Sequence, residues 1–270
     1  MLLALEILFR NLGLFFVDVK YREFILLAAK YGKAKRYKNK NIKFFGFKFN
    51  VPDPYSFLWQ IKEIFVDESY KFLPASDSPV IYDCGSNVGT SVAYFRKEYP
   101  EAKIKAFEAD PKIFSILKEN LSKNGIENVE LFNKAVWIND EGVEFGIEGA
   151  DGSSVFSKEN TVRVESIRLK KLLSEEDEID LLKMDIEGAE ANVIPDCVEE
   201  LGKVKNLFIE YHTFIGKEQN LAEVLSILEK SGFRYFIKQE ADRKIPFVNR
   251  TNKNNPQMDL QLNIYAYREE

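Results

Sequence analysis

A short apolar run that ends in an acid and a glycine loop constrains the fold of this chain more than any other feature. Residues 80–95 read VIYDCGSNVGTSVAYF, so that Asp83 precedes a loop from Gly85 to Gly89 and a helical pattern follows. Strand, glycine loop and helix in this order are typical of an open parallel sheet, in which ligands bind beyond the carboxyl ends of the strands. The sequence therefore predicts a ligand site at this loop.

The residues of the loop distinguish between three classes of ligand. A phosphate loop needs a lysine directly after its last glycine, but Gly89 is followed by Thr90. A dinucleotide loop needs a glycine where Asn87 stands, and a carboxylate at Asp83 would repel a pyrophosphate. The same carboxylate attracts the ammonium group of a methionine moiety, and Glu108 at the end of AFE can accept hydrogen bonds from two ribose hydroxyls. We therefore expect S-adenosylmethionine, with an NAD-dependent oxidoreductase as the weaker alternative.

Beyond residue 80, apolar segments of strand length alternate with helical patterns, which predicts an α/β fold with a mostly parallel sheet and helices on both faces. The expected parallel strands read VIYDC, AKIKAFE, NVELFNKAV, IDLLKMDI and NLFIEYH. One helix is expected to follow the first strand with Thr90 or Ser91 as its cap, and another to begin at Asp110. The final segments RYFIKQ and LQLNIYAYRE predict an antiparallel edge hairpin, and residues 141–167 predict an inserted β-element.

The first 75 residues have a different pattern, and we assign 1–75 to an N-terminal helix and hairpin cap and 76–270 to the main domain. NIKFFGFKFNV predicts a hairpin that turns near Gly46, and FLWQIKEIF predicts a helix. The opening MLLALEILFRNLGLFF is too short and too charged to span a membrane and predicts an amphipathic helix. Such a helix packs on its own protein, on a partner subunit in a homo-oligomer, or on a membrane surface. The basic stretch 33–48 could dock an anionic substrate or surface, or could simply be a solvated loop.

Charge and cysteine content exclude several other classes. A net charge of −5 and a pI near 5.3 argue against nucleic acid as the main partner. Cys84 and Cys197 match no metal-binding or redox spacing, which indicates a reducing environment. The sequence thus predicts a cytoplasmic protein, and contact with the inner membrane face is the alternative that the first helix leaves open.

Taken together, DCGSNVG, AFEAD, NKAVW, LLKMDIEGAE and IEYH resemble the FkbM-type S-adenosylmethionine-dependent methyltransferases, over roughly residues 60–235. This resemblance implies a class I methyltransferase fold, which is Rossmann-like, with a seven-stranded sheet and an antiparallel last strand. It also implies transfer of a methyl group to a hydroxyl of a sugar, glycan or secondary metabolite. A non-catalytic S-adenosylmethionine-binding or scaffold protein is the alternative from another class.

The resemblance and the loop together assign residues to the cofactor. Glu108 is expected at the ribose, the loop residues at the methionine moiety, and the end of the third strand, including Val136, near the adenine. Ala109 stands where the family usually has proline. The expected cofactor-binding residues are Asp83, Gly85, Ser86, Asn87, Gly89, Glu108, Ala109, Asn133, Ala135 and Asp185.

The catalytic candidates follow the fourth and fifth strands. His212, the only histidine of the chain, is the natural base for an alcohol acceptor at neutral pH, although a lone histidine is often structural. Asp185 is expected to contact the donor or to orient the acceptor, and Glu187 heads the next loop. Lys183 is expected either to act in catalysis or to form an ion pair that holds the end of the strand. Glu190 is expected to cap the following helix.

Metal dependence remains open from the sequence. The carboxylates of Asp185, Glu187 and Glu210, together with His212, could assemble a Mg²⁺ site at the acceptor, but no tight ligand motif requires one. The turn 151–154 could fold over the donor, although an ordinary turn is expected. Tyr55 and Tyr70 could line the acceptor pocket, although ordinary core aromatics are expected.

Overall fold

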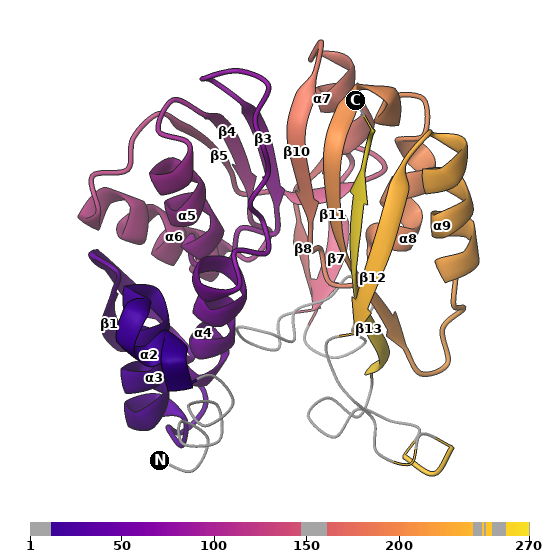
Figure 1. The fold of residues 1–270 in the computed structure, drawn as a ribbon. Helices are drawn as coiled ribbons and strands as arrows, with labels where there is room; N and C mark the ends of the chain where they lie inside the picture. Colours follow the sequence, from indigo (N-terminus) through magenta and orange to yellow (C-terminus); the bar gives the residue numbers. More distant parts are fainter. Residues whose placement is uncertain (1–11, 147–160, 240–244, 246, 250–257, 270) are drawn as a thin grey trace.

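The computed structural model describes residues 12–146, 161–239, 245, 247–249 and 258–269. Its centre is a seven-stranded sheet in the order β12-β13-β11-β10-β3-β4-β5 (Figure 1). The strands of this sheet are β3 (Val80–Cys84), β4 (Lys103–Phe107), β5 (Val129–Phe132), β10 (Ile179–Met184), β11 (Val204–Phe214), β12 (Arg234–Gln239) and β13 (Met258–Tyr267). β11, β10, β3, β4 and β5 run parallel, whereas β13 is antiparallel to both β11 and β12. The predicted fold class, including the antiparallel last strand, is confirmed.

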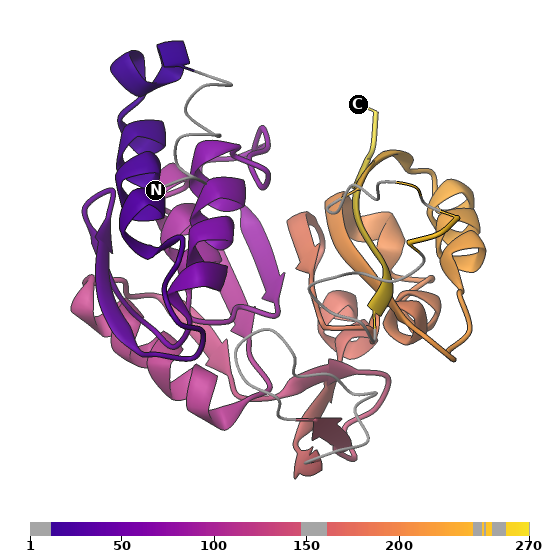
Figure 2. The ribbon, with the colours of Figure 1, turned by 90° about the horizontal axis from the view of Figure 1, so that it is seen from below.

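Helices cover both faces of this sheet, because each central strand is apolar on both sides. Ile81 packs into the core under α5 and α6, while its neighbour Tyr82 packs into a second core under α8 and α9, as the pleat of a strand requires. Figures 1 and 2 show the two layers on opposite sides of the sheet. The helices of the main domain are α5 (Thr90–Glu98), α6 (Pro111–Lys123), α7 (Leu169–Ser174), α8 (Glu190–Asp196), the 3₁₀ turn η2 (Leu201–Lys203) and α9 (Leu221–Lys230).

The helix starts were predicted with mixed success. Asp110 caps α6 as expected, since its Oδ1 accepts hydrogen bonds from Lys112 N at 2.7 Å and Ile113 N at 3.3 Å. The predicted cap of α5 was wrong: Thr90 is already the first helical residue, and the cap position is Gly89 with φ +88°. Glycine can adopt a left-handed backbone at the cap position at little steric cost, even though it has no side chain to accept a hydrogen bond. The search for a Ser or Thr cap therefore missed Gly89.

The segment NVELFNKAV does not form one strand. β5 ends at Phe132, and β6 (Ala135–Trp137) leaves the sheet to pair in parallel with β9 (Ser166–Arg168). The inserted β-element is present as the antiparallel pair β7 (Val143–Gly146) and β8 (Thr161–Val164). The turn 151–154 lies outside the described residues.

The N-terminal segment packs on the same face of the sheet as α5 and α6. Its elements are α2 (Leu12–Val17), α3 (Val19–Tyr31), β1 (Lys40–Phe44), β2 (Phe47–Val51), α4 (Pro54–Ile61) and the π-helical turn η1 (Lys62–Val66). The hairpin turns at Phe45 and Gly46, both with positive φ, as the glycine predicted. Phe24, Phe49 and Phe65 belong to the same buried cluster as Val92 of α5. The segment therefore shares a core with the main domain.

Within the described residues, no helix has the length and apolar character needed to cross a membrane. Most of the opening amphipathic segment lies outside those residues, so its predicted packing or membrane contact stays a prediction.

Candidate functional site

The glycine loop between β3 and α5 packs against the end of β10. Gly85, Asn87 and Gly89 have φ values of +85°, +47° and +88°. A Cβ atom on Gly85 would lie 1.8 Å from the carbonyl oxygen of Asp185, so another side chain cannot be accommodated there. Asn87 is a non-glycine residue in the left-handed region, a conformation that concentrates at ligand sites. The loop therefore brings its backbone directly to the edge where β10 ends.

Glu108, just beyond β4, is held in one orientation by the backbone. Its Oε2 accepts a hydrogen bond from Asn87 N at 3.0 Å, and its Oε1 accepts one from Asp110 N at 2.8 Å. Asn133 fixes the strand end, because its Nδ2 donates to Glu108 O at 2.8 Å and to Ala109 O at 3.2 Å. Burial raises the pKa of Glu108 to about 7 and the Asp110 carboxylate adds to this, while the two backbone N–H groups oppose it. The result is a half-buried carboxyl with both oxygens aimed by the fold.

A pocket opens between these elements. Phe107, Ile113 and Val136 supply apolar wall, and Glu108 lies among them. The polar and charged lining residues are Asn87, Glu108, Asp110, Lys134, Asp185 and Glu187. The pocket thus runs from an apolar slot at β4 and β6 to an acidic end at β10.

Asp83 lies behind the loop and is not among the residues that line this pocket. Its side chain is fully buried, accepts a hydrogen bond from Ser91 Oγ at 2.6 Å through Oδ2, and faces Lys183 Nζ at 3.4 Å through Oδ1. Lys183 Nζ also donates to Gly85 O at 2.7 Å and lies 3.3 Å from Asp185 Oδ2. Burial alone would lower the pKa of Lys183, but the carboxylates of Asp185 and Asp83 outweigh it and hold that pKa above its ordinary value. Lys183 therefore joins the loop to the end of β10 as a cation.

His212 is buried among three carboxylates. Its Nε2 lies 3.4 Å from Glu210 Oε1 and 4.0 Å from Glu187 Oε2, and its Nδ1 lies 3.5 Å from Glu190 Oε1. Burial alone would lower the pKa of His212, but Glu187, Glu190 and Glu210 raise it well above 6.5. This departs from the free neutral imidazole that the sequence suggested, because an imidazole in this environment holds its proton.

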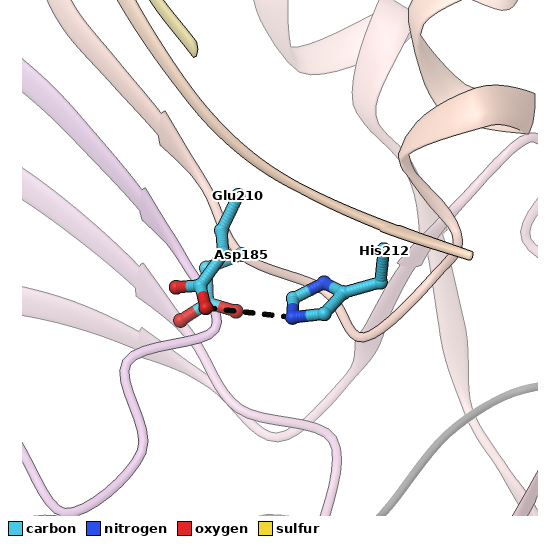
Figure 3. A group of neighbouring side chains, drawn as sticks. All are labelled: Asp185, Glu210 and His212. Carbon is cyan, nitrogen blue, oxygen red and sulfur yellow. Dashed lines mark ion pairs between the residues drawn. The ribbon is translucent and has the colours of Figure 1, made fainter. Parts of the chain in front are cut away.

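Asp185, Glu210 and His212 converge beyond the end of β10 (Figure 3), and Asp185 among them lines the pocket. Met184 pairs with Ile209 in parallel register, so Asp185 and Glu210 follow side by side, and His212 is on the same face of β11 as Glu210. One potential ligand atom from each of the three lies within 4.8 Å of the others. Burial raises the pKa of Asp185, and the neighbouring Glu210 carboxylate raises it further. The sequence foresaw these three residues as neighbours, and the structure brings them together.

Other predicted residues occupy supporting positions. Ala109 and Ala135 line the pocket, whereas Ser86 is buried and donates from Oγ to Asp83 O at 2.8 Å. Tyr70 is buried with its ring centroid 6.0 Å from Lys183 Nζ, and Tyr55 packs against Trp59 instead. Their cofactor and catalytic roles stay predictions.

Sequence reasoning missed three contributions to the site. Glu190 was expected to cap α8, but it is the first residue of that helix, whose cap position, Ala189, has no side-chain cap; its Oε1 instead accepts from Ile186 N at 3.0 Å and Gly188 N at 3.2 Å in the preceding loop, and it faces His212. Gln261 on β13 donates to Glu210, a pairing visible only from the antiparallel register of β11 with β13. Lys134 lines the pocket, and its position inside NKAVW was the available signal.

The strand order, the glycine loop after β3 and the acid at the end of β4 define a class I methyltransferase. The family model described as the methyltransferase FkbM domain matches residues 83–235, which is more than half of the chain. The chain therefore belongs to the FkbM methyltransferase family, as its sequence resemblance implied.

Three curated relatives are similar to this chain. Methyltransferase 1 of Beauveria bassiana is 25% identical, over 66% of this chain and 81% of the relative. The 2-O-methyltransferase NoeI of Sinorhizobium fredii is 29% identical, over 49% of this chain and 63% of the relative. The hexuronic acid methyltransferase AglP of Haloferax volcanii is 25% identical, over 57% of this chain and 66% of the relative.

Proposed function

We propose that this chain is an S-adenosylmethionine-dependent O-methyltransferase whose acceptor is a hydroxyl of a sugar, a glycan or a similar small polyol. The observation that carries the cofactor assignment is Glu108, whose two carboxyl oxygens are fixed by Asn87 N and Asp110 N at the edge of a pocket. A carboxylate held in this way can accept hydrogen bonds from two vicinal hydroxyls, the feature that ribose presents.

The residues around Glu108 fit the rest of an adenosyl group. Phe107, Ile113 and Val136 offer apolar contact for a purine ring, and the backbone of the loop at Gly85 approaches without a side chain. At the other end, Asp185 and Glu187 offer negative charge for an ammonium and a sulfonium. When bound, S-adenosylmethionine supplies an electrophilic methyl group on its sulfonium sulfur.

The protein's own side chains then have to orient the acceptor and remove its proton. Methyl transfer forms an oxygen–carbon bond, breaks the sulfur–carbon bond to leave neutral S-adenosylhomocysteine, and releases the proton of the hydroxyl. Glu187 lines the pocket, has a φ of +55° and is 30% exposed at its side chain, so it can accept that proton and pass it to water. His212, held as a cation by its three carboxylates, supports this arrangement as a donor of hydrogen bonds.

The names of two relatives support a hydroxyl-bearing carbohydrate as the acceptor. NoeI is a 2-O-methyltransferase, and AglP is a hexuronic acid methyltransferase. The acidic end of the pocket is compatible with polyols, because carboxylates accept hydrogen bonds from hydroxyl groups.

The proposal is tested by titration calorimetry with S-adenosylmethionine, followed by a methyl-transfer assay on a panel of sugars and uronic acids with mass-spectrometric detection. We expect binding and transfer by the wild type, and a loss of affinity of about 10- to 100-fold in Glu108→Ala, because hydrogen bonds to a charged group contribute about 1.5–3 kcal/mol. Glu127→Gln, which changes an exposed acid after α6, is the matched control and should bind normally.

Two other outcomes have defined meanings. Binding of S-adenosylmethionine without transfer to any acceptor of the panel would support a non-catalytic binding or scaffold protein. Binding of NADH in place of S-adenosylmethionine would contradict the proposal and would indicate an NAD-dependent oxidoreductase instead.

A further inference from the structure

Around the end of β10, behind the acidic end of the pocket, carboxylates outnumber cations. Asp83, Asp185, Glu190 and Glu210 have side chains that are 0%, 27%, 0% and 14% exposed. Within the described part of the chain, their recorded ion pairs are with Lys183 and His212. Carboxylates removed from water are paired with cations or bind metal ions, because unpaired charge is expensive to bury. The excess of negative charge favours the binding of a further cation here.

The histidine in this cluster is oriented as a metal ligand is. His212 is 4% exposed, and its Nε2 edge faces Asp185 and Glu210 (Figure 3). Its opposite nitrogen, Nδ1, is buried without a well-formed hydrogen bond and lies 3.5 Å from Glu190 Oε1. A cation bound at Nε2 would displace the proton that His212 otherwise holds there, and the Glu190 carboxylate behind Nδ1 would keep the remaining N–H on that side, which is the tautomer that binds a metal.

Neighbouring residues hold the two carboxylates in place. Glu210 accepts a hydrogen bond from the side-chain amide of Gln261 on the adjacent strand β13. Lys183 contacts Asp185 through Oδ2 at 3.3 Å, and a carboxylate can accept from a lysine with one oxygen while it binds a cation with the other. The site is thus built on two adjacent strands with supporting contacts, and is more than a group of surface acids.

We propose that Asp185, Glu210 and His212 bind a divalent cation of the Mn²⁺ type, which positions the acceptor hydroxyl at the acidic end of the pocket. Two carboxylates and one imidazole suit Mn²⁺ better than Mg²⁺, since Mg²⁺ prefers oxygen ligands alone. Three protein ligands leave coordination positions for hydroxyl oxygens of the acceptor. This inference rests on the proposed function for its role, but cation binding itself can be measured without cofactor or acceptor.

The test uses the full chain without an affinity tag, stripped with a chelator and titrated with Mn²⁺ alone. Electron paramagnetic resonance of free Mn²⁺ should show one ion bound per chain. Because His212 is the only histidine, imidazole nitrogen coupling in the electron spin-echo spectrum of bound Mn²⁺ would identify it directly. A folded wild type that binds no Mn²⁺, or binds it without imidazole coupling, would overturn the proposal.

Variants give an independent readout. His212→Ala and Asp185→Asn should weaken Mn²⁺ binding at least tenfold and abolish the Mn²⁺-induced rise in melting temperature, whereas Glu218→Gln, an exposed acid after β11, should behave as wild type. Equal Mn²⁺ binding by folded His212→Ala would contradict the site. A wild type that binds S-adenosylmethionine and transfers methyl groups but binds no Mn²⁺ would refute the cation alone, whereas a wild type that binds Mn²⁺ but not S-adenosylmethionine would refute the proposed function alone.

Discussion

Lys183 Nζ lies 3.4 Å from Asp83 Oδ1, and their side chains are 3% and 0% exposed. The register of β3 with β10 pairs these two residues directly, so the acid before the glycine loop and the lysine in the fourth parallel strand form one buried ion pair. The acid that identified the loop in the sequence therefore also has a structural role. Asp83 pairs with Lys183, and the ammonium group of Lys183 donates a hydrogen bond to the carbonyl oxygen of Gly85 in the loop.

Replacement of Asp83 by Asn should destabilise the protein. Loss of one partner of a buried pair leaves an uncompensated charge and costs about 3–5 kcal/mol, and we expect about 3 kcal/mol because Lys183 keeps Asp185. Urea denaturation measures this free energy of unfolding. Glu119→Gln, which removes an exposed ion pair with Lys123, is the control and should leave the midpoint unchanged. Similar midpoints for the two variants would show that the pair contributes nothing.

Replacement of Gly85 by Ala should disrupt the junction between the loop and β10. The new Cβ would overlap Asp185 O and adopt a left-handed backbone, so we expect a loss of more than about 2 kcal/mol and of S-adenosylmethionine binding. Gly125→Ala is the matched control, because its φ is +62° but nothing lies within 4 Å of its Cβ position. It should lose only about 1 kcal/mol. Equal thermal shifts in the two variants would contradict the steric explanation.

The local patterns of the sequence sufficed for the sheet and the loop. β3, β4, β10 and β11 are segments of strand length rich in apolar residues, with isolated charged residues within them, and helical patterns separate most of them, so their type and order could be read directly. The departure of β6 from the sheet could not be predicted, because Ala135 and Val136 are apolar whichever strand they pair with. The same limit applies to Glu190: its contact with His212 joins α8 to β11, and sequence spacing says nothing of such tertiary pairs. The burial of Asp83 behind the loop likewise depends on register with β10.

The carboxyl of Glu108 should make stability depend on pH. Its pKa is raised from 4.5 to about 7 in the folded protein, so between these values the folded state holds a proton that the unfolded state has released. This contribution to stability is complete below pH 4.5 and is lost as pH rises through about 7, by about 3 kcal/mol in total. Comparison of wild type with Glu108→Gln, by urea denaturation at pH values from 5 to 8, isolates it.

If the free energy of unfolding depends on pH in the same way for the wild type and Glu108→Gln between pH 5 and 8, the raised pKa of Glu108 is contradicted. Since the ionised carboxylate is the better acceptor for hydroxyl donors, the proposed cofactor should bind more tightly as pH rises toward 7 and reach a plateau above it. Calorimetry at the same pH values measures this, and Glu108→Gln should remove the dependence.

Asn120 connects the N-terminal hairpin to the glycine loop. Its side chain is fully buried, accepts from Asn50 N at 2.7 Å, and donates to Asn50 O at 3.0 Å and to Val88 O at 2.9 Å. Asn120→Ala should cost about 2–4 kcal/mol, since each lost hydrogen bond contributes about 1 kcal/mol and leaves buried groups unpaired. Because Val88 belongs to the loop, the affinity for S-adenosylmethionine should also fall several-fold.

Asn124, one helical turn later, provides the matched control for this link. Its Oδ1 accepts a hydrogen bond from Lys48 N of the same hairpin, and its Nδ2 donates one to Lys48 O, both at 2.8 Å. None of the hydrogen bonds of its side chain recorded within the described residues reaches the glycine loop. Asn124→Ala should therefore loosen the hairpin and lower stability without changing cofactor affinity. If both variants weaken the cofactor equally, the hairpin acts through the whole core and the direct bond from Asn120 to Val88 has no special part in shaping the loop.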